Sequence, residues 1–327
     1  MLLQSQCVLL MLCRMCSLGL HIVGSYSLRN VYRREKESSK DQLLFLLNLA
    51  LSDMVLDTMD LLRLQVLPLF GVYSTERRRT ELESDLLITR EAISGCVYYT
   101  TLGGIAVHRL MKLRGSYKYP LYCDKQKIIF FLKTIWLMAL FFAIAHCVFH
   151  SYYRGSGEIN LEVLVYKYFY APFDVVLVCV FAGSCVYIVG QQIKSSTFNR
   201  KYARRGSTSA RRRALLRNPR TYIPLFLGLS FLVFAVAPDI YIIITSKRDE
   251  PLGRVFRGEK AILSYVCNII LRMNDSLIYI FLHPAVRKFI WTKFRSCWQR
   301  RASIRRHRRV SNALVTSTVE TIVSVRR

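Results

Sequence analysis

Apolar residues gather along the chain into seven blocks of about 20, and polar or basic segments separate one block from the next. About 20 consecutive apolar residues are what a helix needs to cross the hydrocarbon core of a bilayer. The blocks cover residues 6–27, 43–70, 88–113, 128–150, 171–193, 222–245 and 261–281. The pattern predicts an all-α membrane protein, a bundle of seven transmembrane helices. A short amphipathic eighth helix is expected at 284–298, ahead of a basic, disordered tail at 299–327.

The first block begins almost at Met1, so a secretory signal peptide is the alternative to a membrane helix. Signal peptides begin with a basic segment and end at a small-residue cleavage site. The first block has neither, and Arg14 interrupts its apolar run. We therefore assign residues 1–42 to a first transmembrane helix and first inner loop, and residues 43–283 to helices two to seven.

The second and third blocks carry charged or polar residues at depths where the bilayer is apolar. These residues are Asp53, Asp57, Asp60 and Arg63 in the second block, and Arg90, Glu91, His108 and Arg109 in the third. A charge at the middle of the bilayer costs on the order of 3 kcal/mol on insertion scales. Such residues are tolerated when they face the interior of a helix bundle, which is where functional groups lie. We expect these side chains to face inward.

The chain of 327 residues is strongly basic, with 48 Lys and Arg against 21 Asp and Glu, and 52% of it is hydrophobic. This composition excludes a disordered protein, a disulfide-rich secreted fold and a soluble nucleic-acid binder. If the N-terminus lies outside, 33 basic residues fall in the inner segments and 11 in the outer ones. Because inner loops of membrane proteins are rich in Lys and Arg, we predict a multi-pass plasma-membrane protein with its C-terminus in the cytoplasm.

No motif in the sequence indicates catalysis. It has no glycine-rich phosphate loop, no nucleophile motif and no set of metal-ligating residues at a recognised spacing. We therefore expect no enzyme activity, no cofactor and no metal site.

Short motifs recur in order along the blocks, at spacings typical of one receptor family. The second block reads LLFLLNLALSD, the third ends in IAVHRL, the sixth contains FAVAPD, and the seventh ends in NDSLIYIFLHPAVRKF. The key positions in these and the neighbouring blocks are Asn48, Asp53, Arg109, Trp136, Tyr187, Pro238 and Tyr279. Together they resemble the rhodopsin-like (class A) G-protein-coupled receptors over residues 43–294. The chain looks like a divergent, invertebrate-type member, and its last block has no lysine for a retinal Schiff base.

The resemblance implies that Arg109 meets the heterotrimeric G protein when helix six moves outward. A guanidinium suits this contact because it stays charged and offers a planar set of donors. Tyr187, Tyr279 and Pro238 would belong to the same switch. The family's acid before the arginine is His108 here, so we hypothesise that a resting-state restraint is lost and basal activity is raised. The alternative is a decoupled, receptor-derived membrane protein that acts as a non-signalling partner or trafficking subunit.

A second group of residues is expected to form a buried polar cluster. In the family, the carboxylate at Asp53 and polar partners on helices three and seven hold a sodium ion. The partner positions here are Tyr98, Arg272 and Asp275. Because a buried carboxylate needs a counter-charge, we predict an Asp53–Arg272–Asp275 cluster in place of the ion. A purely structural salt bridge and a switching role both fit this prediction.

Two further charged residues lie toward the expected ligand pocket. Glu91 is 18 residues before Arg109, where amine receptors of the family place the acid that pairs with a ligand ammonium. Arg63 should lie at a similar depth and could neutralise Glu91 internally. The extracellular ligand therefore stays unknown, because one receptor scaffold serves many ligand classes.

The inner side of the protein offers further partners. The third inner loop and the tail are rich in Arg and Lys, which favours contact with acidic inner-leaflet lipids over nucleic acid. Cys297 ends the amphipathic stretch, where a palmitoyl chain could anchor it. Ser and Thr residues of the tail, beginning with Ser303, could be phosphorylated and bind arrestin.

Overall fold

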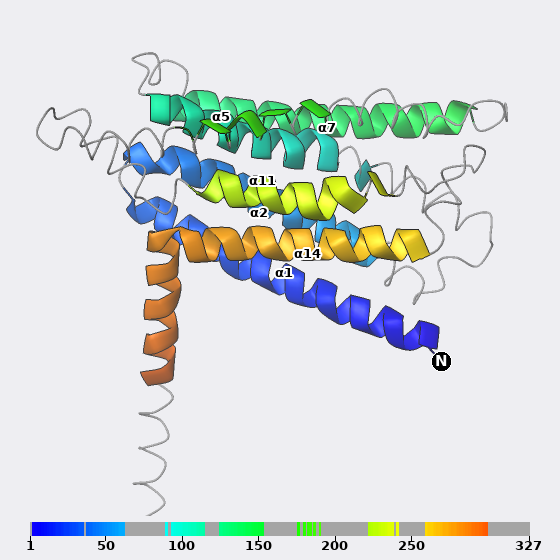
Figure 1. Ribbon diagram of the computed structural model, residues 1–327, viewed down its shortest axis with the longest axis horizontal. Coiled ribbons are helices and arrows are strands. Elements are labelled where there is room, and N and C mark those ends of the chain that lie inside the picture. The colour runs from blue at the N-terminus through cyan, green and yellow to red at the C-terminus, as the bar shows by residue number, and fades with distance from the viewer. Residues whose placement is uncertain are drawn as a thin grey trace, which may run out of the picture.

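The computed structural model is almost entirely helical over the residues it describes (Figure 1). These are residues 2–35, 37–62, 89–90, 93–114, 124–153, 222–238, 240–241 and 259–299, with pieces at 175–176, 179–180, 182–184, 186–187 and 190. The main elements are α1 (Leu2–Arg34), α2 (Glu37–Leu61), α5 (Thr100–Arg114), α7 (Lys125–Tyr153), α11 (Ile223–Phe231) and α14 (Glu259–Leu282). Two π-helical segments, η2 (Ser94–Tyr99) and η5 (Leu232–Val236), adjoin α5 and α11. The prediction of an all-α membrane fold is confirmed.

Four helices are long and apolar enough to cross a membrane, among the residues that are described. Their spans are Leu9–Arg34, Lys40–Leu61, Lys125–Ala145 and Tyr265–Leu282, and Ile223–Val236 is a shorter apolar helix. The third predicted block forms the third helix, described at 89–90 and 93–114, which is not among these four spans. Most of the fifth block lies outside the described residues. On α7, apolar side chains point away from the protein, with Phe130, Leu137 and Phe141 exposed by 72%, 67% and 64%. Such a surface suits lipid.

The helices pack around a core shared by α2, α5 and α11. α1 lies along α2 and α14, and α11 lies against α5 and α14. Leu46 and Leu49 of α2, Leu102 of α5 and Phe231 of α11 are all buried in this core. α2 begins at Glu37, six residues before its apolar block, because Glu, Ser and Lys extend a helix beyond the part that hydropathy detects.

A proline starts the last helix in a new direction. α14 ends at Leu282, and the following helix at 284–299 turns away from the bundle in a different direction (Figure 1). Pro284 has no N–H and disfavours a helical conformation at His283, yet it suits the first turn of a helix. The His283 carbonyl accepts the Arg287 N–H at 3.0 Å, which opens the new helix. The predicted disordered tail at 299–327 lies outside the described residues, apart from its first position.

Proline also shapes helix six, the sixth predicted block, which is formed by α11 and η5. Pro238 cannot donate to the carbonyl of Phe234, and its ring crowds that carbonyl. Directly before it, the helix widens into η5, where the Ala237 N–H donates to the Leu232 carbonyl, five residues back. A π-helical turn of this kind kinks a helix and often marks a functional region. Pro238 itself is buried.

Candidate functional site

Three aspartates form a stripe along the buried face of α2. Asp53, Asp57 and Asp60 are spaced four and three residues apart, which places them on one side of the helix. Their side chains are 0%, 0% and 1% exposed. Carboxylates this deeply buried need positive partners or hydrogen-bond donors, and helices α1 and α14 supply most of them.

Arg14 of α1 is the strongest of these partners. Its Nη1 atom lies 2.5 Å from Oδ1 of Asp57, and its Nη2 atom lies 2.8 Å from Oδ2 of Asp60. The guanidinium also sits 4.4 Å from the centre of the Tyr265 ring. From the sequence, Arg14 was only a charge that interrupted an apolar block. It is in fact fully buried, and with Ser17, which donates to Oδ2 of Asp57 at 2.6 Å, it ties α1 to α2.

Arg272 of α14 binds the same two carboxylates from the other side. Its Nη1 atom is 2.9 Å from Oδ1 of Asp57 and 3.4 Å from Oδ2 of Asp60. The predicted ion pairs of Arg272 with Asp53 and Asp275 are therefore replaced by pairs with Asp57 and Asp60. Side chains on a helix lean toward its N-terminus. The long Arg272 side chain thus points away from Asp275, toward the N-terminus of α14, and reaches Asp57 and Asp60 of α2.

A third arginine completes this ion-pair network. Nε of Arg90, at the start of the third helix, lies 2.9 Å from Oδ1 of Asp60. Three guanidiniums thus share the carboxylates of Asp57 and Asp60. Removing one member of a buried pair typically costs about 3–5 kcal/mol, since the other charge is left uncompensated. The network therefore fixes α1, α2, α14 and the third helix relative to one another.

Among the described residues, neither Asp53 nor Asp275 forms an ion pair with an arginine. The Tyr98 hydroxyl donates to Oδ2 of Asp275, so two of the predicted cluster residues do meet. Tyr98 belongs to the π-helical segment η2, which changes the register of the third helix at this level. Neither oxygen of Asp53 has a hydrogen-bond partner, and Nδ1 of His21 lies 3.9 Å from its Oδ2 atom. The three arginines thus neutralise Asp57 and Asp60, whereas Asp53 and Asp275 add carboxyl groups to the network without adding an arginine.

Tyr279 is held against α1. Its hydroxyl lies 2.8 Å from the Ser276 Oγ atom, which in turn lies 2.6 Å from Nδ1 of His21. A Cβ atom on Gly24 would come within 2.7 Å of the Tyr279 ring. Only glycine leaves room for the ring there. Arg14, Ser17, His21 and Gly24 share one face of α1, and this helical spacing inside an apolar block was the signal that sequence reasoning missed.

Arg109 and His108 lie near the C-terminal end of α5, and both are 4% exposed. The His108 ring packs on Phe45 of α2, with ring centres 5.6 Å apart. Gly104, one turn earlier, brings α5 close to the same phenylalanine, since a Cβ atom there would be 2.8 Å from its ring. His108 therefore contacts α2 through its ring.

The remaining predicted residues are more dispersed. Tyr187 is half-buried in the short piece at 186–187, and Cys297 is an exposed free cysteine on the helix at 284–299. Glu91 and Arg63, the predicted ligand-pocket residues, lie outside the described residues. Within the described part of the chain, no group of three or more His, Cys, Asp or Glu side chains is arranged to hold a metal ion.

Comparison with known proteins identifies the fold. No protein-family model matches the chain, and no curated protein matches its sequence. The crystal structure of squid rhodopsin is similar in structure, with a TM-score of 0.58 at 14% sequence identity. The match covers 90% of this chain and 85% of squid rhodopsin. The fold is therefore that of the rhodopsin-like seven-transmembrane bundle, as the sequence predicted.

Proposed function

We propose that this membrane protein is a G-protein-coupled receptor that passes an extracellular signal to heterotrimeric G proteins. The observation that carries the proposal is Arg109, a buried arginine near the C-terminal end of α5 in a bundle with the rhodopsin fold. The signal would reach it through an outward movement of helix six. The N-terminus would lie outside the plasma membrane and the C-terminus in the cytoplasm.

The kinked sixth helix supports this mechanism. The η5 segment and Pro238 replace part of the regular hydrogen-bond ladder of helix six, so the two halves of that helix are joined by a weaker segment. α11 packs against α5, which carries Arg109. A tilt about η5 would move α11 away from α5 and open the inner end of the bundle.

The contacts of Tyr279 favour a closed resting state. Its hydroxyl is bonded to Ser276 and its ring lies against Gly24, so the side chain is directed toward α1. Activation would require these contacts to break. His108 would leave Arg109 without the family's acidic restraint, which gives a receptor with raised basal activity.

The other proposed partners follow from the inner surface. Arrestin would bind the phosphorylated tail, and acidic inner-leaflet lipids would bind the basic loops. On the helix at 284–299, the rings of Trp291, Phe294 and Trp298 stack along one exposed side. Aromatic side chains with neighbouring basic residues suit the membrane interface. The ligand remains undefined, since Glu91 would either bind an amine or, as we favour, pair internally with Arg63.

The alternative is a receptor-derived membrane protein that no longer signals. Three departures from the family's motifs favour it: His108 replaces the acid before the arginine, Val236 replaces the aromatic residue two positions before Pro238, and Ser276 replaces the proline of the last helix. It would act as a non-signalling partner or trafficking subunit, and the buried network would then serve stability alone.

Ligand-free G-protein dissociation in cells separates the two functions. The intact chain is compared with Arg109→Ala at matched surface levels, and Arg29→Ala, which removes an exposed arginine from α1, serves as the control. Loss of basal dissociation in Arg109→Ala alone is the expected result. Basal dissociation that survives Arg109→Ala would refute the role of Arg109. No dissociation by the intact chain with any G-protein class would favour the non-signalling alternative.

A further inference from the structure

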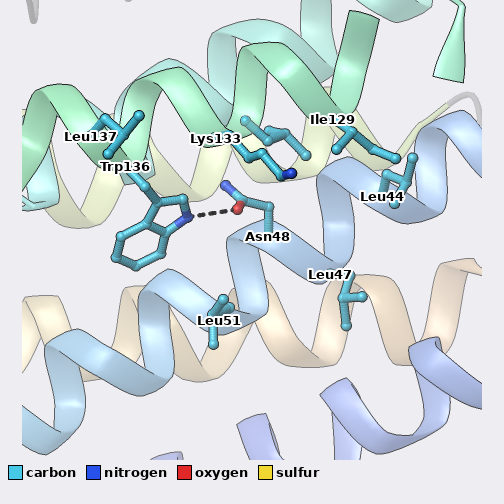
Figure 2. Close-up of a pocket in the computed structure, with 9 residues that line it drawn as sticks. Leu44, Leu47, Asn48, Leu51, Ile129, Lys133, Trp136 and Leu137 are labelled. Atoms are coloured by element: carbon cyan, nitrogen blue, oxygen red, sulfur yellow. Dashed lines mark hydrogen bonds between the residues drawn. The ribbon is translucent and has the colours of Figure 1, made fainter. Parts of the chain in front are cut away.

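A groove of about 540 Å³ runs between α2 and α7 on the outside of the bundle (Figure 2). Its walls are apolar and come from the N-terminal halves of both helices, including Leu44 and Leu47 of α2 and Ile129 of α7. Leu51 and Leu137 on its rim are 46% and 67% exposed. The groove therefore opens sideways, toward the lipid that surrounds a membrane protein.

The polar groups in the floor of the groove are already paired. Nε1 of Trp136 donates to Oδ1 of Asn48 at 2.9 Å, and Nδ2 of Asn48 donates to Thr101 at 2.8 Å. These bonds pin the indole ring across the groove, as Figure 2 shows for the Trp136–Asn48 bond. An occupant would therefore meet apolar surface over the floor and would need no donor or acceptor there.

Lys133 is the charged residue of the groove. It is exposed, and its amino group lies between the two helices on the side of Ile129 (Figure 2). Lys133 is eight residues beyond Lys125, so its Cα lies about 12 Å along α7 from the start of the helix, at about 1.5 Å per residue. Lysine side chains lean toward the helix N-terminus and extend to the membrane surface. The ammonium group thus points toward lipid headgroups.

We infer that this groove binds one anionic phospholipid from the leaflet at the N-terminal ends of α2 and α7. The phosphate and acidic headgroup would pair with Lys133, and an acyl chain would lie along the leucines over Trp136. An anionic headgroup is favoured because it supplies a counter-charge to the Lys133 ammonium at the level of the headgroups. A membrane amphiphile is required because the groove is apolar and opens to the bilayer. This site is independent of G-protein coupling and rests only on the protein being embedded in a membrane.

Tryptophan quenching by lipids with brominated chains tests the site directly. The chain has three tryptophans, and Trp291→Phe with Trp298→Phe leaves Trp136 as the only reporter. This double variant is placed in vesicles that mix phosphatidylcholine and phosphatidylserine, with bromine on the chains of one lipid or the other. The expected result is about a fivefold preference of the site for phosphatidylserine, the equivalent of about 1 kcal/mol for one lysine near an anionic headgroup.

Two variants decide the role of the lysine. Lys133→Gln removes the groove charge and is expected to bring the preference close to one. Lys293→Gln removes an equal charge from the exposed helix at 284–299 and is expected to leave the preference unchanged. Equal quenching by both lipids, or a preference that survives Lys133→Gln, would overturn the proposal. Stronger quenching by a brominated sterol would assign the groove to a sterol, and no quenching would mean that protein covers it; either result also overturns the inference.

Discussion

Replacing Asp57 by asparagine removes one negative charge from the centre of the ion-pair network at nearly constant size. Oδ1 of Asp57 lies 2.5 Å from Arg14 and 2.9 Å from Arg272, and all three side chains are buried. Without this charge, Asp60 alone faces three guanidiniums. The amide nitrogen of asparagine cannot accept hydrogen bonds, so the bond from Ser17 or from an arginine is lost as well.

The expected cost of Asp57→Asn is about 3–5 kcal/mol, the usual penalty for leaving a buried charge without its partner. Since 1.4 kcal/mol is a factor of about ten, the ratio of folded to unfolded protein falls by about two to four orders of magnitude. Native proteins are stable by only about 5–15 kcal/mol. Surface expression should therefore drop severely, and the purified protein should unfold at a clearly lower temperature.

Asp53→Asn is the matched control, one turn earlier on the same face of α2. Neither Asp53 oxygen has a hydrogen-bond partner, and the described network holds four aspartates against Arg14, Arg90 and Arg272. Removing this surplus carboxyl group should be tolerated. Flow cytometry for surface protein and thermal unfolding in detergent measure both variants. Wild-type behaviour of Asp57→Asn would refute the reasoning, and so would an equal loss of stability in Asp53→Asn. Either result would mean that pairing with the arginines does not distinguish Asp57 from Asp53.

Three further predictions concern the switch residues and the tail. Gly24→Ala should lower the free energy of unfolding by about 1–3 kcal/mol, as overpacking usually does, because the new methyl group would clash with Tyr279. Thermal unfolding measures this loss, and Gly19→Ala is the control, because nothing lies within 4 Å of a Cβ atom there. His108→Asp should lower basal G-protein dissociation at matched surface levels by restoring the family's acid, and unchanged basal activity would remove that hypothesis. Cys297→Ser should abolish incorporation of a palmitate analogue, because this cysteine is exposed on the helix at 284–299; labelling that persists would place the acyl chain elsewhere.

The sequence predicted the fold because the bilayer imposes local rules. A helix that crosses hydrocarbon must be apolar over a fixed length, so the blocks are visible without any tertiary information. Proline is equally local, and Pro238 and Pro284 each alter or begin a helix in the structure. Asp53, Asp57 and Asp60 could also be assigned to the bundle interior from cost alone.

The partner of each charge was decided only by the tertiary structure. The sequence paired Arg272 with Asp53 and Asp275, whereas the folded chain pairs it with Asp57 and Asp60. Alignment to the family gives the depth of the Arg272 Cα atom in the membrane. The charged end of such a long side chain, however, lies about one helical turn away from its Cα atom.

Arg14 shows the same limit more strongly. In the sequence it interrupts an apolar block, and its burial between Asp57 and Asp60 appears only when α1 packs against α2. Local composition therefore determined which segments cross the membrane and which faces are polar. Helix packing determined which charges meet, because that depends on the relative rotation and depth of helices far apart in the chain.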